Sequence, residues 1–156
     1  MTRPRRLALR RRLIRVRSPC LLLFVYTLLL AADTTGVLRI GILCALLHES
    51  GHVAVFVLQQ RRLPALEASL AGLCLSLRGV LLTPGQELAL AAAGPALNLL
   101  LAFGALAWME GPAGYGYSGM WFAATNLLVG GFNLIPLPGL DGRRMLAAAA
   151  ALASRR

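Results

Sequence analysis

The segment VLRIGILCALLHESGHVAVFVL, residues 37–58, decides the fold because it combines an apolar run of membrane-spanning length with ionisable side chains in its interior. A helix needs about 20 predominantly apolar residues to cross the hydrocarbon core of a bilayer, and this run is long enough. His48, Glu49 and His52 lie within it. A carboxylate near the middle of a span costs about 2.5–3.5 kcal/mol on insertion scales, so ionisable groups at that depth indicate a functional site.

The spacing of the two histidines predicts a zinc site. On a helix, side chains four residues apart lie about 40° apart around the axis and one turn apart along it, so both imidazoles can reach one ion. Glu49 lies in the same sector, where it can hold a water molecule and take its proton, which is the arrangement of metalloproteases. His48 and His52 are the only histidines in the chain. The alternative, two core histidines beside a helical glutamate, is disfavoured by the apolar surroundings.

Apolar runs elsewhere in the chain predict further spans. The composition, 58% hydrophobic and 14% charged, indicates a bilayer rather than water as the solvent. We therefore predict an all-α integral membrane protein with about four transmembrane helices, near residues 19–32, 37–58, 88–109 and 118–137. A basic segment over residues 1–18 precedes this core of residues 19–156, and a short helix over residues 143–154 ends it. Residues 63–84 alternate loosely between apolar and polar, which predicts short strands against the membrane face.

The net charge of +10 comes from arginine alone. Arginines cluster in residues 1–17 and recur in pairs at residues 61–62, 143–144 and 155–156, at the edges of apolar runs. Four spans place all of these on one side of the membrane, and the positive-inside rule makes that side the cytosol. We therefore expect a multi-pass protein of the cytoplasmic membrane with both termini cytosolic. No basic face is interleaved with aromatic residues, so no nucleic-acid partner is expected, and the lack of lysine indicates a GC-rich, bacterial genome.

Two further expectations concern the first apolar run and the cysteines. Basic residues followed by an apolar run also describe a cleaved signal peptide. A retained span is favoured because the cleavage region at residues 30–32 lacks a small residue at its first position and because another span follows closely. Cys20, Cys44 and Cys74 show no paired spacing, so we expect small buried hydrophobic residues rather than disulfides.

A catalytic zinc needs a third protein ligand and keeps its fourth position for water. Asp141 follows Pro136 and Pro138, which must break the fourth helix, and irregular backbone at membrane depth is tolerated only where it is buried or lines a cavity. A carboxylate ligand would also neutralise part of the charge of the ion. The alternative role for Asp141 is an N-cap of the following helix. Besides Glu49, the acids that could supply the third ligand are Asp33, Glu67, Glu87, Glu110 and Asp141.

Three segments, in this order, resemble motifs of the site-2 protease family of intramembrane metalloproteases. HESGH at residues 48–52 resembles the zinc-binding helix, and AGPALN at residues 93–98 resembles the Ala-Gly-Pro-x-x-Asn segment of the family. Residues 133–142, which run from Asn133 to Asp141-Gly142, resemble the Asn-x-x-Pro…Leu-Asp-Gly element. The resemblance covers about residues 15–145, which is nearly the whole chain.

The resemblance implies that His48, His52 and Asp141 hold Zn²⁺ and that Glu49 is the general base and acid. Asn133 would bind the substrate or stabilise the oxyanion, and residues 63–84 would present an extended substrate by strand addition. The residues implied to be catalytic or to support substrate binding are Glu49, Asn133, Asn98, Pro136 and Pro138.

The predicted function is therefore hydrolysis of peptide bonds in membrane-protein substrates within or near the bilayer. The expected partners are a transmembrane or membrane-associated protein substrate, such as a sporulation or stress factor, and the lipids. Two alternatives stay open: a metal-handling transporter, which would not require Glu49, and a catalytically inactive protease-like scaffold. Gly139 stands where the family often has a second proline and Arg143 where a second glycine is common, which should alter loop stiffness rather than ligand chemistry. No regulatory domain is recognisable, so we expect a minimal core.

Overall fold

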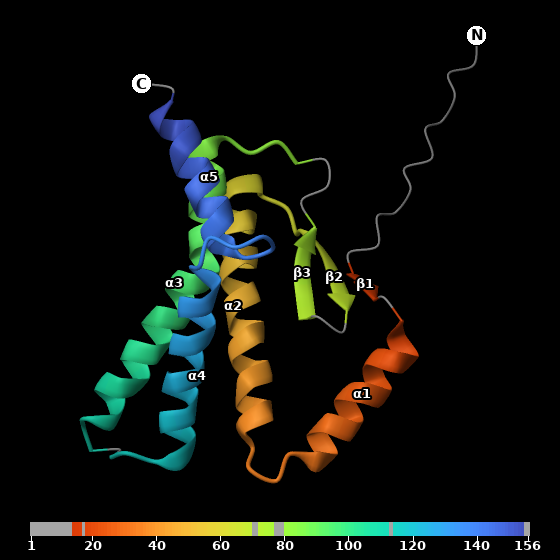
Figure 1. The fold of residues 1–156 in the computed structure, drawn as a ribbon, viewed down its shortest axis with the longest axis vertical. Coiled ribbons are helices and arrows are strands. Elements are labelled where there is room, and N and C mark those ends of the chain that lie inside the picture. The colour runs from red at the N-terminus through yellow and green to blue at the C-terminus, as the bar shows by residue number, and fades with distance from the viewer. Residues whose placement is uncertain (1–13, 17, 70–71, 77–79, 113, 155–156) are drawn as a thin grey trace.

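The computed structural model describes residues 14–16, 18–69, 72–76, 80–112 and 114–154 (Figure 1). Within these residues the chain forms five helices and three short strands, so the prediction of a mostly helical protein is confirmed. Most of the basic N-terminal segment and the last arginine pair lie outside the described residues. The elements are β1 (Ile14–Val16), α1 (Pro19–Ala32), α2 (Val37–Gln60), β2 (Ala65–Ser69), β3 (Gly72–Ser76), α3 (Pro84–Met109), α4 (Tyr117–Asn133) and α5 (Asp141–Ala153).

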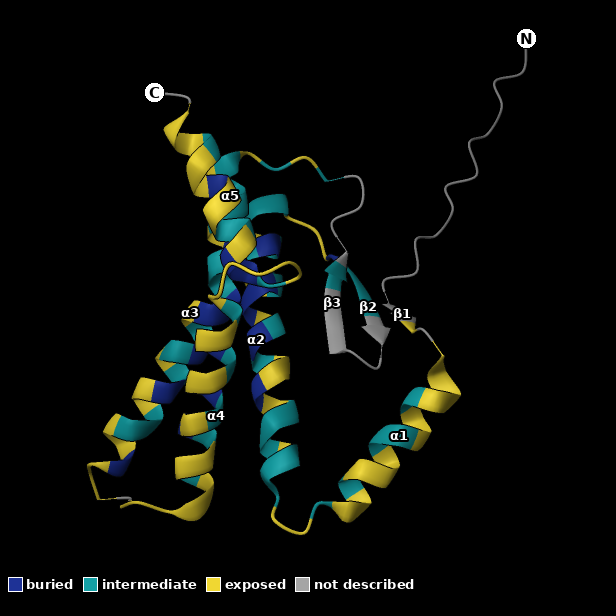
Figure 2. Cartoon of the chain, viewed as in Figure 1, coloured by how far each residue is buried: buried dark blue, intermediate teal, exposed yellow. Residues whose placement is uncertain are grey.

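The helices α2, α3 and α4 form a bundle, and α3 is its central member because it packs against α2, α4 and α5 (Figure 1). The helix α1 diverges from this bundle and has no buried residue, whereas buried positions gather where α2, α3 and α4 meet (Figure 2). Cys20 on α1 is exposed, so its expected burial was wrong, because α1 packs too little against the other described elements to cover it. Cys44 on α2 is buried as expected. The side chain of Cys74 is outside the described part of the structure.

A three-stranded sheet lies between α1 and α2, in the order β1-β2-β3 (Figure 1). The strands β2 and β3 are antiparallel, with Glu67 opposite Cys74, and they form in the segment where the alternating pattern predicted strands. The parallel pairing of β1 with β2 was not predicted, because β1 falls at the end of the arginine-rich segment. In this order β3 is an edge strand and is the strand that contacts α2.

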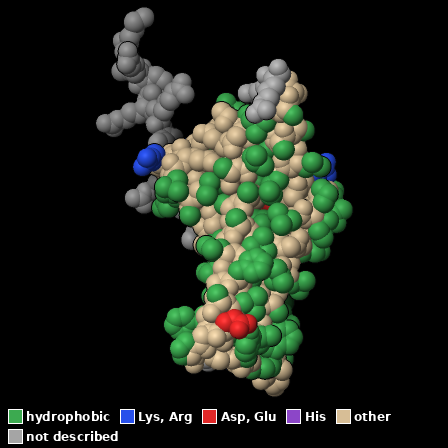
Figure 3. All heavy atoms as spheres, turned by 90° about the vertical axis from the view of Figure 1, so that its left-hand side faces the viewer, with side chains coloured by type: hydrophobic (Ala, Val, Ile, Leu, Met, Phe, Trp, Pro, Cys, Tyr) green, Lys and Arg blue, Asp and Glu red, His purple; other side chains and the backbone are tan. Residues whose placement is uncertain are grey.

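The helical bundle exposes large apolar side chains and buries several polar ones together with its hydrophobic core. Among the described residues, α2 and α3 are the helices that are long and apolar enough to cross a membrane. Hydrophobic side chains cover the length of the helical bundle in Figure 3, and Leu100 and Trp108 on α3 are more than two-thirds exposed, at 70% and 74%. Asn98 and Asn126, in contrast, are fully buried. Polar groups in the core and apolar groups on the outside match a bilayer better than water.

The ends of the helices differ from the predicted ends for local reasons. The helix α3 begins at Pro84, earlier than the predicted residue 88, because Thr83 and Gln86 form a reciprocal capping box. The helix α4 ends at Asn133, earlier than residue 137, because Pro136 has no N–H to continue the helix. The helix α5 begins at Asp141, earlier than residue 143.

Asp33 fixes the loop between α1 and α2. Its Oδ2 accepts a hydrogen bond from the backbone N–H of Arg39 at 3.2 Å, and its Oδ1 accepts one from the Thr35 hydroxyl at 3.2 Å. Burial raises the pKa of the Asp33 carboxyl, but these bonds and others from the start of α2 outweigh burial and hold the pKa below its ordinary value. Asp33 therefore has a structural role at the entry to α2.

Candidate metal centre

Two of the candidate ligands are brought together by the helical spacing of α2. His48 and His52 lie one turn apart, their ring centroids are 4.9 Å apart, and their Nε2 atoms are 3.2 Å apart. Their residues are only 5% and 4% exposed. The apolar sequence on both sides keeps this stretch of α2 helical, and the packing of α2 against α3 buries the histidine-bearing face.

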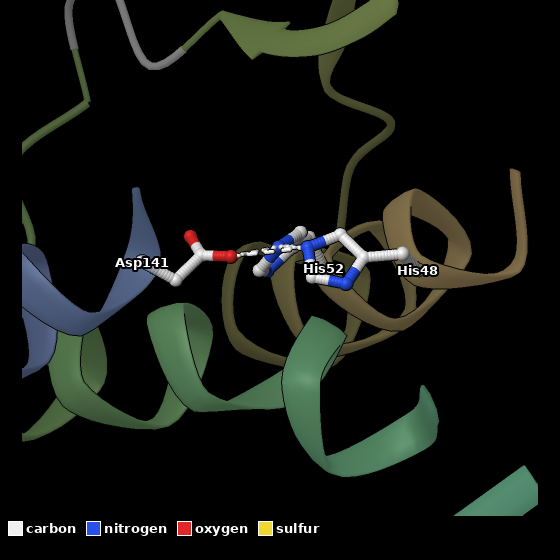
Figure 4. A group of neighbouring side chains, drawn as sticks. All are labelled: His48, His52 and Asp141. Atoms are coloured by element: carbon white, nitrogen blue, oxygen red, sulfur yellow. Dashed lines mark hydrogen bonds and ion pairs between the residues drawn. The ribbon is translucent and has the colours of Figure 1, made fainter. Parts of the chain in front are cut away.

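The third candidate ligand comes from the other end of the sequence. Asp141 is the first residue of α5, and its Oδ2 lies 3.0 Å from Nε2 of His48 and 3.1 Å from Nε2 of His52 (Figure 4). Asp141 is 7% exposed. Within the described part of the chain, these three residues are the only group of histidine, cysteine and carboxylate side chains close enough to hold one metal ion.

The Nδ1 nitrogen of each imidazole has a defined hydrogen-bond partner. Nδ1 of His52 donates to the carbonyl oxygen of Leu90 at 2.8 Å, because a carbonyl can only accept. Nδ1 of His48 donates to Oδ1 of Asn98 at 2.8 Å. Nε2 of each ring faces the other ring and Oδ2 of Asp141. Imidazoles held through Nδ1 in this way are typical of metal sites.

The donor set fits zinc in distance and in chemistry. Zinc bonds of about 2.0–2.1 Å at tetrahedral angles place neighbouring ligand atoms about 3.3 Å apart, close to the observed 3.0–3.2 Å. Space at the site comes from Gly94 on α3, where a Cβ would lie 2.4 Å from Nε2 of His52 and 2.7 Å from Nε2 of His48. Only glycine at this position leaves both Nε2 atoms accessible. This explains why the AGPALN segment needs a glycine at residue 94.

A buried ladder of amides extends from His48 across the bundle. Asn98 on α3 turns its oxygen toward His48 because its Nδ2 donates to Oδ1 of Asn126 at 2.8 Å and to the carbonyl of Cys44 at 3.3 Å. Asn126 on α4 donates in turn to the carbonyl of Phe122 at 2.9 Å and to Sγ of Cys44 at 3.1 Å. Asn98 therefore contacts a candidate ligand directly. Asn126 was not predicted, although an amide inside an apolar run was a signal that could have identified it.

Asp141 does not cap α5, so the alternative role considered for it is wrong. Leu140 occupies the N-cap position, and α5 has no side-chain cap hydrogen bond. Both oxygens of Asp141 are used elsewhere: Oδ2 faces the two histidines, and Oδ1 accepts a hydrogen bond from Nη1 of Arg144 at 3.2 Å.

The remaining predicted site residues lie on α2, at the end of α4 and in the loop that follows α4. Glu49 is half-buried on α2, between the two histidines in sequence. Asn133 ends α4, and its Nδ2 donates to the carbonyl of Val129 at 2.9 Å. Pro136 and Pro138 are exposed in the loop that leads from α4 to Asp141.

The loop before Asp141 depends on one of the departures from the family motif. Gly139 has a φ of 91°, which a proline, with φ near −65°, cannot adopt. Beyond the loop, a Cβ at Gly142 would lie 2.0 Å from the carbonyl oxygen of Leu134, so α5 begins in close contact with the end of α4. Gly139 therefore adopts a conformation that a proline at this position could not adopt.

Comparison with known proteins finds similarity to zinc metalloproteases by name. No family model matches the chain. Over 109 residues the chain is 37% identical to "Putative zinc metalloprotease Rip3" of Mycobacterium tuberculosis, in strains Erdman and H37Rv. This match covers 66% of the chain and 28% of Rip3, so the chain spans less than a third of the length of this relative.

The fold is similar to that of a solved structure. The chain superposes on the Site-2 Protease from Methanocaldococcus jannaschii with a TM-score of 0.64 at 24% identity, covering 88% of this chain and 67% of that one. The chain is therefore similar to Rip3 in part of its sequence and to the Site-2 Protease from Methanocaldococcus jannaschii in its fold.

Proposed function

We propose that this protein is an intramembrane zinc metalloendopeptidase that hydrolyses peptide bonds of membrane-protein substrates within or beside the bilayer. The observation that carries this proposal is the convergence of Nε2 of His48, Nε2 of His52 and Oδ2 of Asp141, all within 3.2 Å of one another. Glu49, which follows His48 in the sequence, adds a carboxylate. The name of the relative Rip3 as a zinc metalloprotease supports the same chemistry.

The proposed mechanism divides the work between the metal and Glu49. Zinc, when bound, supplies a Lewis acid that polarises the scissile carbonyl and makes water more acidic. Glu49 accepts a proton from the attacking water and delivers it to the leaving amine. His48, His52 and Asp141 hold the metal, while Asn98 and the carbonyl of Leu90 keep both imidazoles oriented.

The substrate is proposed to bind at the sheet and at the end of α4, where Asn133 lies. A helical substrate has to unwind first, because its peptide bonds are shielded by their own hydrogen bonds. The edge strand β3, which contacts α2, is suited to pair with the unwound segment. Asn133 is proposed to bind this segment or the oxyanion, for which its amide must leave the carbonyl of Val129.

We further propose that α1, α2, α3 and α4 all cross the cytoplasmic membrane. The helix α1 has 14 residues and α4 has 17, so at about 1.5 Å per residue they reach about 21 and 25 Å, less than the roughly 30 Å of a typical hydrocarbon core. The flanking loops or a locally thinner bilayer must supply the rest. In this topology the basic segment of residues 1–18 and the C-terminus of the core of residues 19–156 both lie in the cytosol.

Reporter fusions test this topology. Fusions after Arg62 and after Arg156 are expected to report a cytosolic location, and a fusion at Ala113 an external one, because arginines flank only the first two positions. Alkaline phosphatase and a fluorescent protein, used in parallel, give signals of opposite sign at each position. A cytosolic signal at Ala113 would contradict the four-span arrangement.

Replacement of Asp141 by asparagine tests the metal centre. The amide keeps the size of the side chain but removes the anionic ligand, so zinc affinity is expected to fall by at least about tenfold and substrate cleavage with it. Metal analysis of the purified protein measures this loss. The matched control is Asp33→Asn, which makes the same change in the loop before α2 and is expected to keep one zinc per chain. A full zinc content in Asp141→Asn would refute the ligand role.

A further inference from the structure

Two ion pairs, both made by Arg144, connect Oδ1 of Asp141 to Glu87 in the first turn of α3. Nη1 of Arg144 donates to Oδ1 of Asp141 at 3.2 Å. The same guanidinium reaches Oε1 of Glu87 through Nε and Nη2, both at 2.9 Å. The side chains of Arg144 and Glu87 are 33% and 28% exposed, and that of Asp141 is 9% exposed. The two ion pairs therefore link the partly exposed Arg144 and Glu87 to the buried Asp141.

We propose that Arg144 and Glu87 form a positioning pair that holds Asp141 as a ligand through one oxygen. This inference rests on the proposed zinc site and adds two residues to it. The bond from Arg144 occupies Oδ1, which leaves Oδ2 as the oxygen that faces His48 and His52. Arg144 and Glu87 do not touch the reacting atoms, so their effect on the reaction passes through Asp141.

The placement of Asp141 gives such a pair a role. Oδ2 of Asp141 faces the two histidines, and the bond from Arg144 is the contact that holds its other oxygen among the described residues. A carboxylate whose second oxygen is bound by a planar guanidinium loses freedom to rotate. The guanidinium is itself fixed because Glu87 lies in the capped first turn of α3.

The charges of the pair cancel near the metal. Arg144 alone would place a positive charge next to a cation and weaken metal binding, but Glu87 lies against the same guanidinium and compensates it. A change that removes both charges together therefore separates the effect of position from the effect of charge. Arg143, the adjacent arginine, is exposed and provides a matched control.

The test compares zinc affinity in four purified full-length proteins: wild type, Arg143→Gln, Arg144→Gln and the double variant Arg144→Gln/Glu87→Gln. Competition with a chromophoric chelator gives the affinity. The double variant has the net charge of the wild type, and its zinc affinity is expected to fall by about 10- to 100-fold, as for other residues that orient metal ligands. Arg143→Gln is expected to stay within about twofold of the wild type.

Cobalt substitution gives a second readout that a purely structural role would not change. If Asp141 gains a second free oxygen in Arg144→Gln, the visible absorption of bound Co²⁺ is expected to weaken and shift as the coordination number rises. Thermal unfolding of the metal-free proteins shows whether the variants still fold. A lower unfolding temperature with wild-type zinc affinity and an unchanged cobalt spectrum would overturn the positioning role. Failure of the wild type itself to bind zinc would overturn the proposed function, and this inference with it.

Discussion

Replacing Glu49 by glutamine is expected to lower the rate of substrate cleavage by about 100- to 10,000-fold while zinc stays bound, because the group that takes the proton from water is lost. The three candidate ligands, His48, His52 and Asp141, keep their own contacts in this variant. Glutamine has nearly the same size as glutamate, so packing on α2 should be preserved. Co-expression with candidate transmembrane substrates, followed by quantification of the cleaved fragment, measures the effect.

The same substitution at Glu110 is the control for this experiment. Glu110 follows the end of α3 and is exposed, far along that helix from the Gly94 contact with the histidines, so cleavage is expected to stay at the wild-type level. Near-wild-type cleavage by purified Glu49→Gln would exclude the protease mechanism. Metal flux that persists in Glu49→Gln without any cleavage in the wild type would favour a transporter.

Adding one methyl group at Gly94 is expected to abolish zinc binding and cleavage together. The new Cβ would lie 2.4 Å from Nε2 of His52 and 2.7 Å from Nε2 of His48, both shorter than real contacts of this kind. Neither ring can retreat without losing its hydrogen bond, from His48 to Asn98 or from His52 to the carbonyl of Leu90. Metal analysis and the cleavage assay on Gly94→Ala test both expectations.

Gly104→Ala is the matched control on the same helix. Nothing lies within 4 Å of a Cβ built at Gly104, so the methyl group should be accommodated, and the free energy of unfolding should change by no more than about 1 kcal/mol, in the stabilising direction. Gly94→Ala protein that inserts normally and holds one zinc per chain would show that the site is more open than the contacts at Gly94 indicate.

The helices were predictable from the sequence because long apolar runs have few alternative structures in a bilayer. The residues of α1 and the core of α2 followed from the position and length of the apolar runs. The ends were less predictable because they depend on side-chain contacts: Gln86 had to reach back to Thr83 before α3 could begin at Pro84. The strand β1 was missed because its pairing with β2 joins segments that are distant in sequence.

The arrangement around His48 could be predicted only in part. A spacing of four residues on one helix places His48 and His52 together without knowledge of the fold, whereas Asp141 needed both its proline-broken segment and the family resemblance. Asn126 reaches the site through Asn98 on another helix, and no local pattern encodes this pairing. Arg144 contacts Asp141 within α5 at a spacing of three residues, whereas its ion pair with Glu87 joins α5 to α3 and has no local signal. The sequence shows that such residues are unusual in apolar surroundings, but not which groups they meet.

The buried ladder of amides has a consequence for biogenesis. In the proposed topology α2 leaves the ribosome before α3 and carries two imidazoles whose partners, the carbonyl of Leu90 and the amide of Asn98, belong to α3. Asn98 in turn pairs with Asn126 on α4. A lone α2 would meet lipid with these groups unpaired, at a cost of several kcal/mol. The insertion machinery is therefore expected to retain α2 until α3 has been synthesised and to release the two helices as a pair.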